Sequence, residues 1–378
     1  MPRTRPAQLL LFLPMLVGGL LRLQVGAVDH GIFWPDEIYQ SFEPAHALVF
    51  GHGLIPWEFV QGARNWALPG LVALLLKLCA IVGADQPAQY VVFVKEVFAL
   101  VSLGAAWGAY RLARSFEVDE PWAAAGAAVV SLATPIIYFA PRAMSENATT
   151  VPVVWGLALL LDRALVTSAF DGVGNVKAKR LVWLGASLLG LGVMLRLQSA
   201  VFCVAIIAVI SARRQWKLLA HVGAVLAVWA FLFGALDAVT WHQVPEAKAG
   251  GWFHSAVVYL RFNLIEGKAA GWGVAPWHFF VTRSWESMPW VSVVLAAGLL
   301  GSLRKAPGLV FIALLFLVLH SVTPHKEYRF VLPVLPVLAA LASIAVTELK
   351  VERLRQVAAV LLVETSLTAL RVLGPYLG

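Results

Sequence analysis

Charged residues are scarce in this sequence, and their scarcity excludes a water-exposed globular surface. Asp, Glu, Lys and Arg make up 13% of the 378 residues, whereas about 25% is usual in soluble domains. Hydrophobic residues account for 60% of the chain, and its mean hydropathy is +0.79. Such a chain has too few charges to cover a surface in water, so we expect lipid to solvate much of it.

Cysteine and phosphate-binding loops are also lacking. The two cysteines, Cys79 and Cys203, lie in apolar stretches and form neither a CxxC pair nor a zinc-binding spacing. They are therefore predicted to be small buried hydrophobic residues. No glycine-rich phosphate loop occurs between the apolar runs, which argues against an ATP site. We expect no metal and no organic cofactor.

Long apolar runs dominate the sequence instead. Their approximate ranges are 7–28, 68–84, 88–110, 121–140, 150–166, 181–195, 199–212, 217–238, 288–303, 307–322, 328–347 and 356–373. A helix needs about 20 apolar residues to cross a bilayer, so the runs predict an all-α integral membrane protein. No linker rich in Pro, Gly or Ser divides them, and residues 1–378 are expected to form one membrane domain. The first run lacks a clear cleavage site and is interpreted as a retained spanning helix.

The basic residues indicate a topology. They form the clusters Arg3/Arg5, Arg111/Arg114, Lys177/Lys179/Arg180, Arg213/Arg214/Lys217, Arg304/Lys305 and Lys350/Arg353/Arg355. All six clusters fall on one, cytoplasmic side if the short run 68–84 does not cross. That run also contains Lys77, so it is predicted to lie in the interface or to re-enter, which leaves about eleven spanning helices. The net charge of +8 is thus attributed to membrane topology rather than to nucleic-acid binding.

This topology places four segments on the outer face: about 29–66 with the in-plane run after it, 141–149, a short turn near Arg196, and 239–287 joined by 323–328. An acidic pair lies in the first of them. Pro35 suits a first helical turn, and Asp36 and Glu37 would suit the positive end of that helix. Glycosyl transfer needs a carboxylate beside an acceptor hydroxyl, a role that Asp36 fits. Glu37 would position the acceptor or tune Asp36 through like-charge repulsion. A well-placed helix start explains the pair equally well.

Three outer-face arginines are candidates for binding a phosphate, because a guanidinium matches phosphate oxygens in a bidentate fashion. Arg64 could instead be the counter-charge of the acidic pair. Arg142 could pair with Glu146. Arg196 lies between two apolar runs and could simply extend its head group to water.

Two further segments carry candidate residues. His278 lies among glycines and aromatics, a composition that suits a sugar or polyprenyl site and equally suits interfacial anchoring. His325, Lys326, Glu327 and Arg329 are gathered where a spanning helix begins, which indicates a functional site. The alternative is a self-neutralising cluster at the membrane edge. No second histidine at a metal-binding spacing accompanies His325.

Three sequence blocks carry a family resemblance. They are Trp34–His46 with Gly51, Trp57–Phe59 and Arg64; Phe262–Gly273 with Pro276–His278; and His325–Phe330 with Pro333 and Pro336. In this order they resemble glycosyltransferase family 22, the α-mannosyltransferases that use dolichyl-phosphate-mannose to extend GPI and lipid-linked N-glycan precursors. The departure is Trp34, where the family usually has histidine, and it puts acceptor recognition in doubt.

The resemblance implies a GT-C fold and an inverting, metal-independent transfer from a polyprenyl-phosphate sugar. It assigns catalysis to Asp36, with Glu37 beside it, and places the segment His325–Arg329 near the donor phosphate. The acceptor would be a glycan or glycolipid. The compact chain suits a bacterial relative in the inner membrane with its active site outside; a eukaryotic relative would lie in the endoplasmic reticulum membrane.

Other functional classes remain open from the residues alone. A glycolipid transporter or flippase would usually show an inverted repeat and ionisable residues near the bilayer midplane, whereas here the ionisable residues gather on one face. A non-catalytic scaffold would not need these residues on one face. Within enzymes, a GT-C protein could transfer another sugar such as arabinose or glucose.

Overall fold

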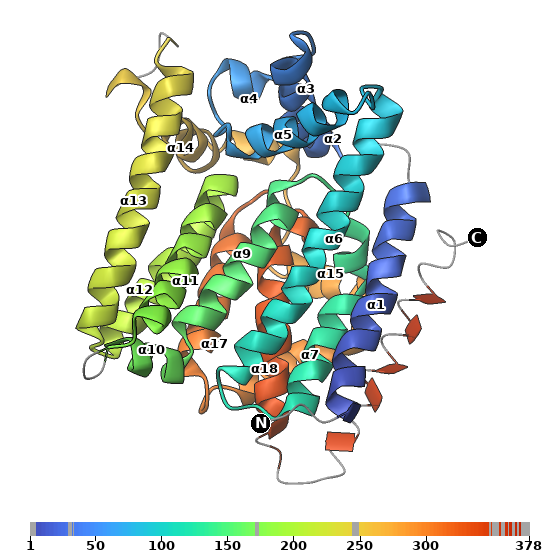
Figure 1. The fold of residues 1–378 in the computed structure, drawn as a ribbon, viewed down its shortest axis with the longest axis vertical. Coiled ribbons are helices and arrows are strands. Elements are labelled where there is room, and N and C mark those ends of the chain that lie inside the picture. Colours follow the sequence, from blue (N-terminus) through green and yellow to red (C-terminus); the bar gives the residue numbers. More distant parts are fainter. Residues whose placement is uncertain are drawn as a thin grey trace.

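The fold comes from a computed structural model, which describes residues 5–28, 32, 34–170, 174–243, 249–347 and 349, together with scattered residues between 355 and 371. Throughout these residues the regular structure is helical, without a β-strand (Figure 1). The predicted all-α architecture is confirmed.

The elements fall into three groups. The longer α-helices are α1 (Arg5–Val28), α5 (Ala67–Ile81), α6 (Pro87–Arg114), α7 (Glu120–Leu132), α9 (Ser145–Leu160), α11 (Val176–Leu195), α12 (Ala200–Ala212), α13 (Trp216–Trp241), α16 (Pro289–Gly301), α17 (Pro307–Val322) and α18 (Leu335–Thr347). The shorter ones are α2 (Pro35–Glu37), α3 (Glu43–Phe50), α4 (Trp57–Val60), α8 (Thr134–Phe139), α10 (Arg163–Phe170), α14 (His254–Leu260) and α15 (Phe279–Ser287). The π-helical segments are η1 (Ile38–Phe42) and η4 (Arg261–Ile265). The 3₁₀-helical segments are η2 (Leu197–Ser199), η3 (Ala249–Gly251), η5 (Lys268–Trp272) and η6 (Tyr328–Val334).

Several helices can cross a membrane. Among the described residues, five helices are long and apolar enough, the bent pair α9–α10 is a sixth candidate, and four further apolar helices are shorter. The protein is therefore a multi-pass membrane protein. The predicted last run, 356–373, falls on a stretch that is described only at scattered positions. The total of eleven spanning helices stays a prediction.

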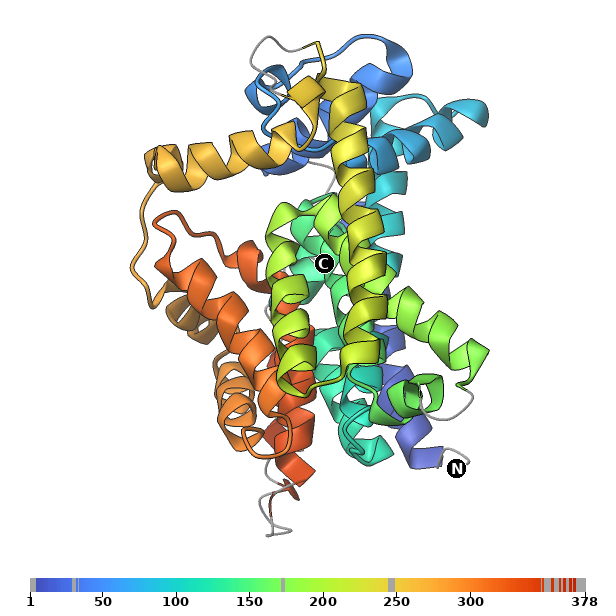
Figure 2. The same cartoon turned by 90° about the vertical axis from the view of Figure 1, so that its left-hand side faces the viewer.

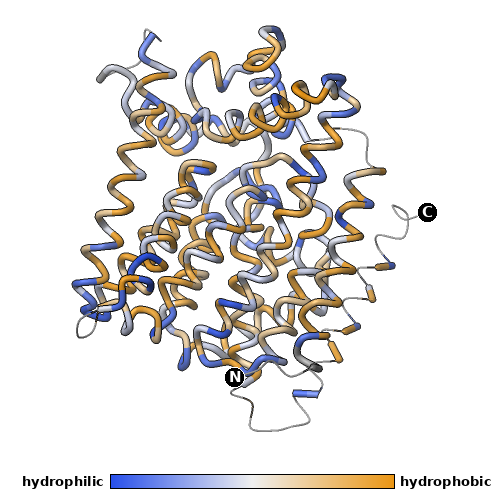
Figure 3. Tube along the Cα trace, in the orientation of Figure 1, coloured by the Kyte–Doolittle hydropathy of each residue, from blue (hydrophilic) through white to orange (hydrophobic). Residues whose placement is uncertain are grey.

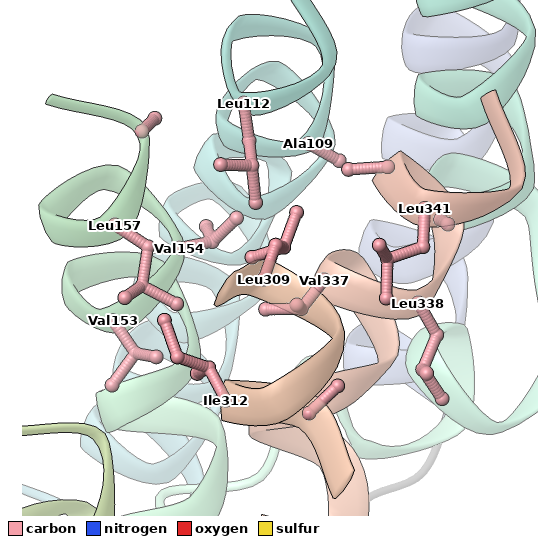
Figure 4. Packing of buried hydrophobic residues seen from close by; sticks show 14 of the residues in the cluster. Ala109, Leu112, Val153, Val154, Leu157, Leu309, Ile312, Val337, Leu338 and Leu341 are labelled. Atoms are coloured by element: carbon pink, nitrogen blue, oxygen red, sulfur yellow. The ribbon is translucent and has the colours of Figure 1, made fainter. Parts of the chain in front are cut away.

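Small residues let the helices of the bundle approach closely. α9 packs against α6 and α11, and a Cβ added to Gly156 of α9 would lie 2.8 Å from the carbonyl oxygen of Gly185 in α11. Aliphatic side chains from α6, α9, α17 and α18 fill the space between the helices (Figure 4). Because lipid is as apolar as these side chains, close packing rather than the hydrophobic effect holds such helices together.

The two ends of the bundle differ. Basic clusters at the end of α6, the start of α11 and the turns α12–α13 and α16–α17 lie at the end that carries the N-terminus (Figures 1 and 3). The opposite end is capped by α2–α5 and α14 (Figures 1 and 2). α5 lies across this cap, as predicted for the run 68–84 as an in-plane segment. The cap is made from the first loop and the long loop, which the sequence analysis places outside.

One predicted run is broken. The run 121–140 ends as α7 at Leu132 and resumes as α8, which has Pro135 in its first turn. Proline has no N–H to give to the carbonyl of Ser131, so the helix cannot continue. Arg22 of α1 supplies the missing donors, because its guanidinium bonds to the carbonyls of Ser131 at 2.5 Å and Val130 at 3.0 Å.

Candidate active site

The acidic pair forms the short helix α2 at the capped end, and its two carboxylates have different surroundings. Pro35 occupies the first turn, as predicted. The side chain of Asp36 is 31% exposed, whereas that of Glu37 is 0% exposed. Only Asp36 can therefore meet a substrate without a rearrangement of the cap.

Glu37 is fixed by the segment after α8. Its carboxylate accepts a hydrogen bond from the backbone N–H of Ala143 at 3.0 Å and lies 3.6 Å from the guanidinium of Arg142. A pair with Glu146 was one of the two roles considered for Arg142, the other being a phosphate contact. The structure instead places Arg142 against Glu37, while Glu146 pairs with Arg196 and Arg329. The buried Glu37–Arg142 contact joins α2 to the segment that leads into α9.

Arg329 of η6 is the centre of a charge cluster that it forms with Asp36, Glu146 and Glu327. Its side chain is 3% exposed and forms an ion pair with Asp36. It also donates to both oxygens of Glu327, at 2.8 and 2.9 Å, and to Glu146 at 3.3 Å. The ring of Trp34 lies below the guanidinium, 5.6 Å away. One buried cation thus holds three carboxylates that are far apart in the sequence.

Glu146 extends the cluster towards a cavity. It lies in the first turn of α9, where the helix dipole favours a negative charge. The Oε1 atom that accepts from Arg329 also lies 2.9 Å from Arg196. Sequence reasoning missed this role and treated Glu146 only as a partner for Arg142. A second outer-face carboxylate near several arginines was the available signal.

The cavity holds about 460 Å³ including its open mouth. Arg64 and Arg196 both line it, and they bring two positive charges to one concave space. Tyr259 faces it from α14, with the Arg64 guanidinium 5.3 Å from the ring and the Gln198 amide bonded to the hydroxyl. Nothing in the sequence pointed to Gln198 or Tyr259, because both come from otherwise apolar segments.

The charges set the protonation of the carboxyls. Burial acts to raise the pKa of Asp36, but the positive charges of Arg329 and Arg64 outweigh it and hold the pKa below its usual value. Glu327 behaves in the same way: burial opposes ionisation, and Arg329 lowers its pKa. Burial raises the pKa of Glu58, which bonds to Gln40 at 3.1 Å. Asp36 is thus ionised in the resting site and ready to accept a proton once Arg329 releases it.

Three predicted residues lie at the edge of the cluster or outside it. His325 bonds to Glu327 at 3.2 Å and so touches the cluster. Lys326 points to the backbone instead, where it donates to the carbonyls of Ala275 and Thr323. His278, which directly precedes α15, bonds to Thr282 of that helix at 3.1 Å.

No group of three His, Cys, Asp or Glu side chains in the described part of the chain could hold a metal ion. The clustered acids face arginines instead. The side chains of the site can supply acid–base and electrostatic chemistry.

Comparisons with known proteins agree with this geometry. The model of the Alg9-like mannosyltransferase family matches residues 16–374. The GPI alpha-1,2-mannosyltransferase 3 of Danio rerio is 27% identical over 350 residues, which are 91% of this chain and 61% of that protein. The GPI mannosyltransferase 3 of Yarrowia lipolytica is 28% identical over 352 residues, 91% and 64% of the two chains. The chain thus spans less than two thirds of the length of these relatives.

Solved structures share the fold. ArnT from Cupriavidus metallidurans bound to undecaprenyl phosphate superposes with a TM-score of 0.66 at 16% identity, over 89% of this chain and 60% of that chain. The archaeal oligosaccharyltransferase AglB from Archaeoglobus fulgidus, in complex with an inhibitory peptide and a dolichol-phosphate, gives 0.61 at 13% identity, over 96% and 55%. The predicted GT-C fold is confirmed.

Proposed function

Because the chain belongs to the Alg9-like mannosyltransferase family, we propose that it transfers a hexose, most simply mannose, from a polyprenyl-phosphate donor to a hydroxyl of a glycan or glycolipid. The observation that carries this proposal is the row of ion pairs that joins Asp36 through Arg329 and Glu146 to Arg196. Arg196 and Arg64 line one cavity. A carboxylate that can accept a proton and a site that can hold a phosphate are what such a transfer requires.

Asp36 is the proposed general base. It takes the proton of the acceptor hydroxyl while that oxygen forms the new bond to the anomeric carbon of the donor. The bond from this carbon to the phosphate oxygen breaks, and its electron pair leaves on the polyprenyl phosphate. The attack comes from the side opposite the phosphate, so the anomeric configuration inverts.

Arg64 and Arg196 are the proposed contacts of the donor phosphate. Negative charge develops on the leaving phosphate, and preorganised cations in a partly dry cavity stabilise that charge more than water does. Their position at the capped end also suits a lipid donor. The polyprenyl tail can stay among the apolar helices while its phosphate reaches the cavity.

The remaining predicted residues are proposed to position these groups or to contact the donor. Glu37 and Arg142 fix α2, and hence Asp36, through a buried contact. Lys326 ties its loop to Ala275 and so presents Arg329 to Asp36. His325 would act through Glu327. His278, in the long outer loop, is proposed to contact the donor from outside the charge cluster.

The capped end is proposed to be the non-cytoplasmic face. The basic turns gather at the opposite end, as the positive-inside rule requires of a cytoplasmic face. The proposed setting is a bacterial inner membrane with the site outside and a bacterial polyprenyl phosphate as carrier lipid. A dolichyl-phosphate donor in the endoplasmic reticulum membrane is the eukaryotic equivalent.

The test is sugar transfer by the purified protein in lipid nanodiscs, with synthetic polyprenyl-phosphate-mannose and a panel of mannosides and glycolipids. We compare wild type, Asp36→Asn and Asp85→Asn, which changes an exposed acid at the same end. A lost general base lowers the rate by about 10² to 10⁴-fold, so Asp36→Asn should abolish measurable transfer and Asp85→Asn should not. Equal transfer by all three proteins would reject Asp36 as the base.

A donor panel with glucose and arabinose separates the sugar from the reaction class. Transfer of arabinose but not mannose would keep the mechanism and correct the donor. Movement of the donor lipid across the membrane without any transfer would favour a flippase.

A further inference from the structure

Glu146 joins the two halves of the site. Its Oε1 atom lies 2.9 Å from Arg196 and 3.3 Å from Arg329, and the side chain is only 5% exposed. Arg196 borders the cavity, whereas Arg329 holds Asp36. A row of alternating charges thus runs from the cavity to the base: Arg196, Glu146, Arg329, Asp36.

The two ends of this row are unequal. The Nε of Arg196 is buried and has no hydrogen-bond partner among the described residues, so this guanidinium can still bind an anion in the cavity. The Arg329 guanidinium is shared by three carboxylates. It can release one of them only if another takes its place.

We infer that Glu146 is a positioning residue that couples an anion bound at Arg196 to the release of Asp36 from Arg329, so that a donor phosphate in the cavity frees the base. This inference rests on the proposed function, because it assigns the phosphate to the cavity. It makes donor binding the event that prepares the site for the acceptor.

The electrostatic steps all act in one direction. A phosphate that engages Arg196 weakens the Arg196–Glu146 pair. Glu146 is then available to neutralise Arg329 more fully, and Arg329 needs Asp36 less. Buried pairs respond strongly to such exchanges, because the surrounding dielectric constant is low.

The freed carboxylate is also a stronger base. Asp36 is held acidic by Arg329 and Arg64, with a smaller contribution from His325. The negative charge of Asp36 in turn acts to raise the pKa values of Glu58 and Glu327. Adding a phosphate charge and withdrawing Arg329 both raise the proton affinity of Asp36.

A purely structural role predicts something different. Glu146 could simply neutralise two arginines that would otherwise repel each other inside the protein. Glu146→Asp separates the two roles, because it keeps the charge but shortens the side chain by one methylene, so one oxygen can no longer reach both arginines at these distances. If neutralisation is all that matters, this variant should behave as wild type.

The experiment measures the proton affinity of Asp36 by infrared titration of its carboxyl band, identified by its absence in Asp36→Asn. The probe is a polyprenyl monophosphate without sugar, added to wild type and to Glu146→Asp in nanodiscs, and its binding is followed in parallel by phosphorus NMR. In wild type the probe should raise the affinity about tenfold, equivalent to one pKa unit. In Glu146→Asp the rise should be clearly smaller although the probe still binds.

Each other outcome has a distinct meaning. Binding with an equal rise in both proteins, or with no rise in either, overturns the coupling but leaves the proposed transfer intact. Failure of the probe to bind wild type overturns both, because the cavity then holds no lipid phosphate. If Glu146→Asp does not fold, Glu146→Gln is the second variant. It should lose the rise because its neutral amide cannot neutralise Arg329 when the probe engages Arg196.

Discussion

Two buried arginines, Arg22 and Arg329, differ in the partners that hold them. Arg329 lies in η6 and is paired with carboxylates from three separate segments. Arg22 lies in α1 and donates to backbone carbonyls and to the hydroxyl of Ser102. Both residues are buried, so burial does not distinguish them.

The partners indicate what each arginine does. Carbonyls at a broken helix end carry partial negative charge, and one guanidinium can satisfy several of them. Arg22 therefore completes the architecture of the α7–α8 break. Arg329 instead holds ionised side chains, of which Asp36 and Glu327 are partly exposed. Ion pairs of this kind can exchange with a substrate, whereas carbonyl contacts of this kind cannot.

The largest effect is expected when the ionic centre is removed. Arg329→Gln takes away the main cation that keeps the pKa of Asp36 low, so that pKa should rise. A general base works only when deprotonated, and the acid limb of the kcat/KM profile should therefore move to higher pH. Transfer at neutral pH should also fall by about tenfold or more, because an unpaired buried carboxylate costs several kcal/mol.

A pH profile of transfer by the nanodisc-embedded protein checks this. Arg64→Gln is the companion variant, because Arg64 also lowers the pKa of Asp36 but has the smaller electrostatic effect of the two. Its acid limb should shift in the same direction by less. An acid limb that stays in place in both variants would show that the rate does not depend on the protonation of Asp36.

The same contrast shows how far the sequence could lead. Asp36 and Arg329 were predicted as site residues because charged side chains at a membrane edge are costly without a function. The in-plane position of α5 followed from Lys77 and from the distribution of basic residues. Both predictions rest on the positions of charged residues relative to apolar runs, which can be read directly from a sequence.

Contacts between distant segments are not visible in this way. The Glu146 bridge depends on contacts of 2.9 and 3.3 Å that join α9 to Arg196, just before η2, and to Arg329 in η6. The choice of Glu37 rather than Glu146 as partner of Arg142 depends on how the segment after α8 packs on α2. The break at Ala133 could have been predicted from Pro135, but the prediction treated the run 121–140 as one helix.

A stability effect is expected at the other arginine. Arg22→Met leaves the carbonyls of Val130 and Ser131 without the guanidinium, and an unsatisfied buried group costs about 1–3 kcal/mol. The thermal midpoint in lipid should fall by several degrees. Transfer per folded molecule should be unchanged, since the hydrogen bonds of Arg22 go to Gly18, Ser102, Val130 and Ser131 rather than to the charge cluster. A loss of transfer with an unchanged midpoint would contradict this separation of roles.

The smallest effect is expected at Glu266, an exposed carboxylate that also bridges two cations. Glu266 lies 2.6 Å from Arg261 and 2.7 Å from Lys268, so one carboxylate bridges two cations, as Glu146 does. Hydrogen bonding from Lys268, followed by that from Arg261, lowers the pKa of Glu266. Any stabilisation is therefore present above the ordinary carboxyl pKa and is lost as the pH falls.

Solvent should nonetheless screen this bridge almost completely, because Arg261 and Lys268 are 69% and 60% exposed. Glu266→Gln should leave the thermal midpoint and the transfer rate at their wild-type values at low and high salt alike. Glu146 also bridges two cations, but it is buried, and screening by salt and water is weak there. A clear loss in Glu266→Gln would mean that the bridging pattern itself, rather than its burial between a cavity and a base, gives Glu146 its role.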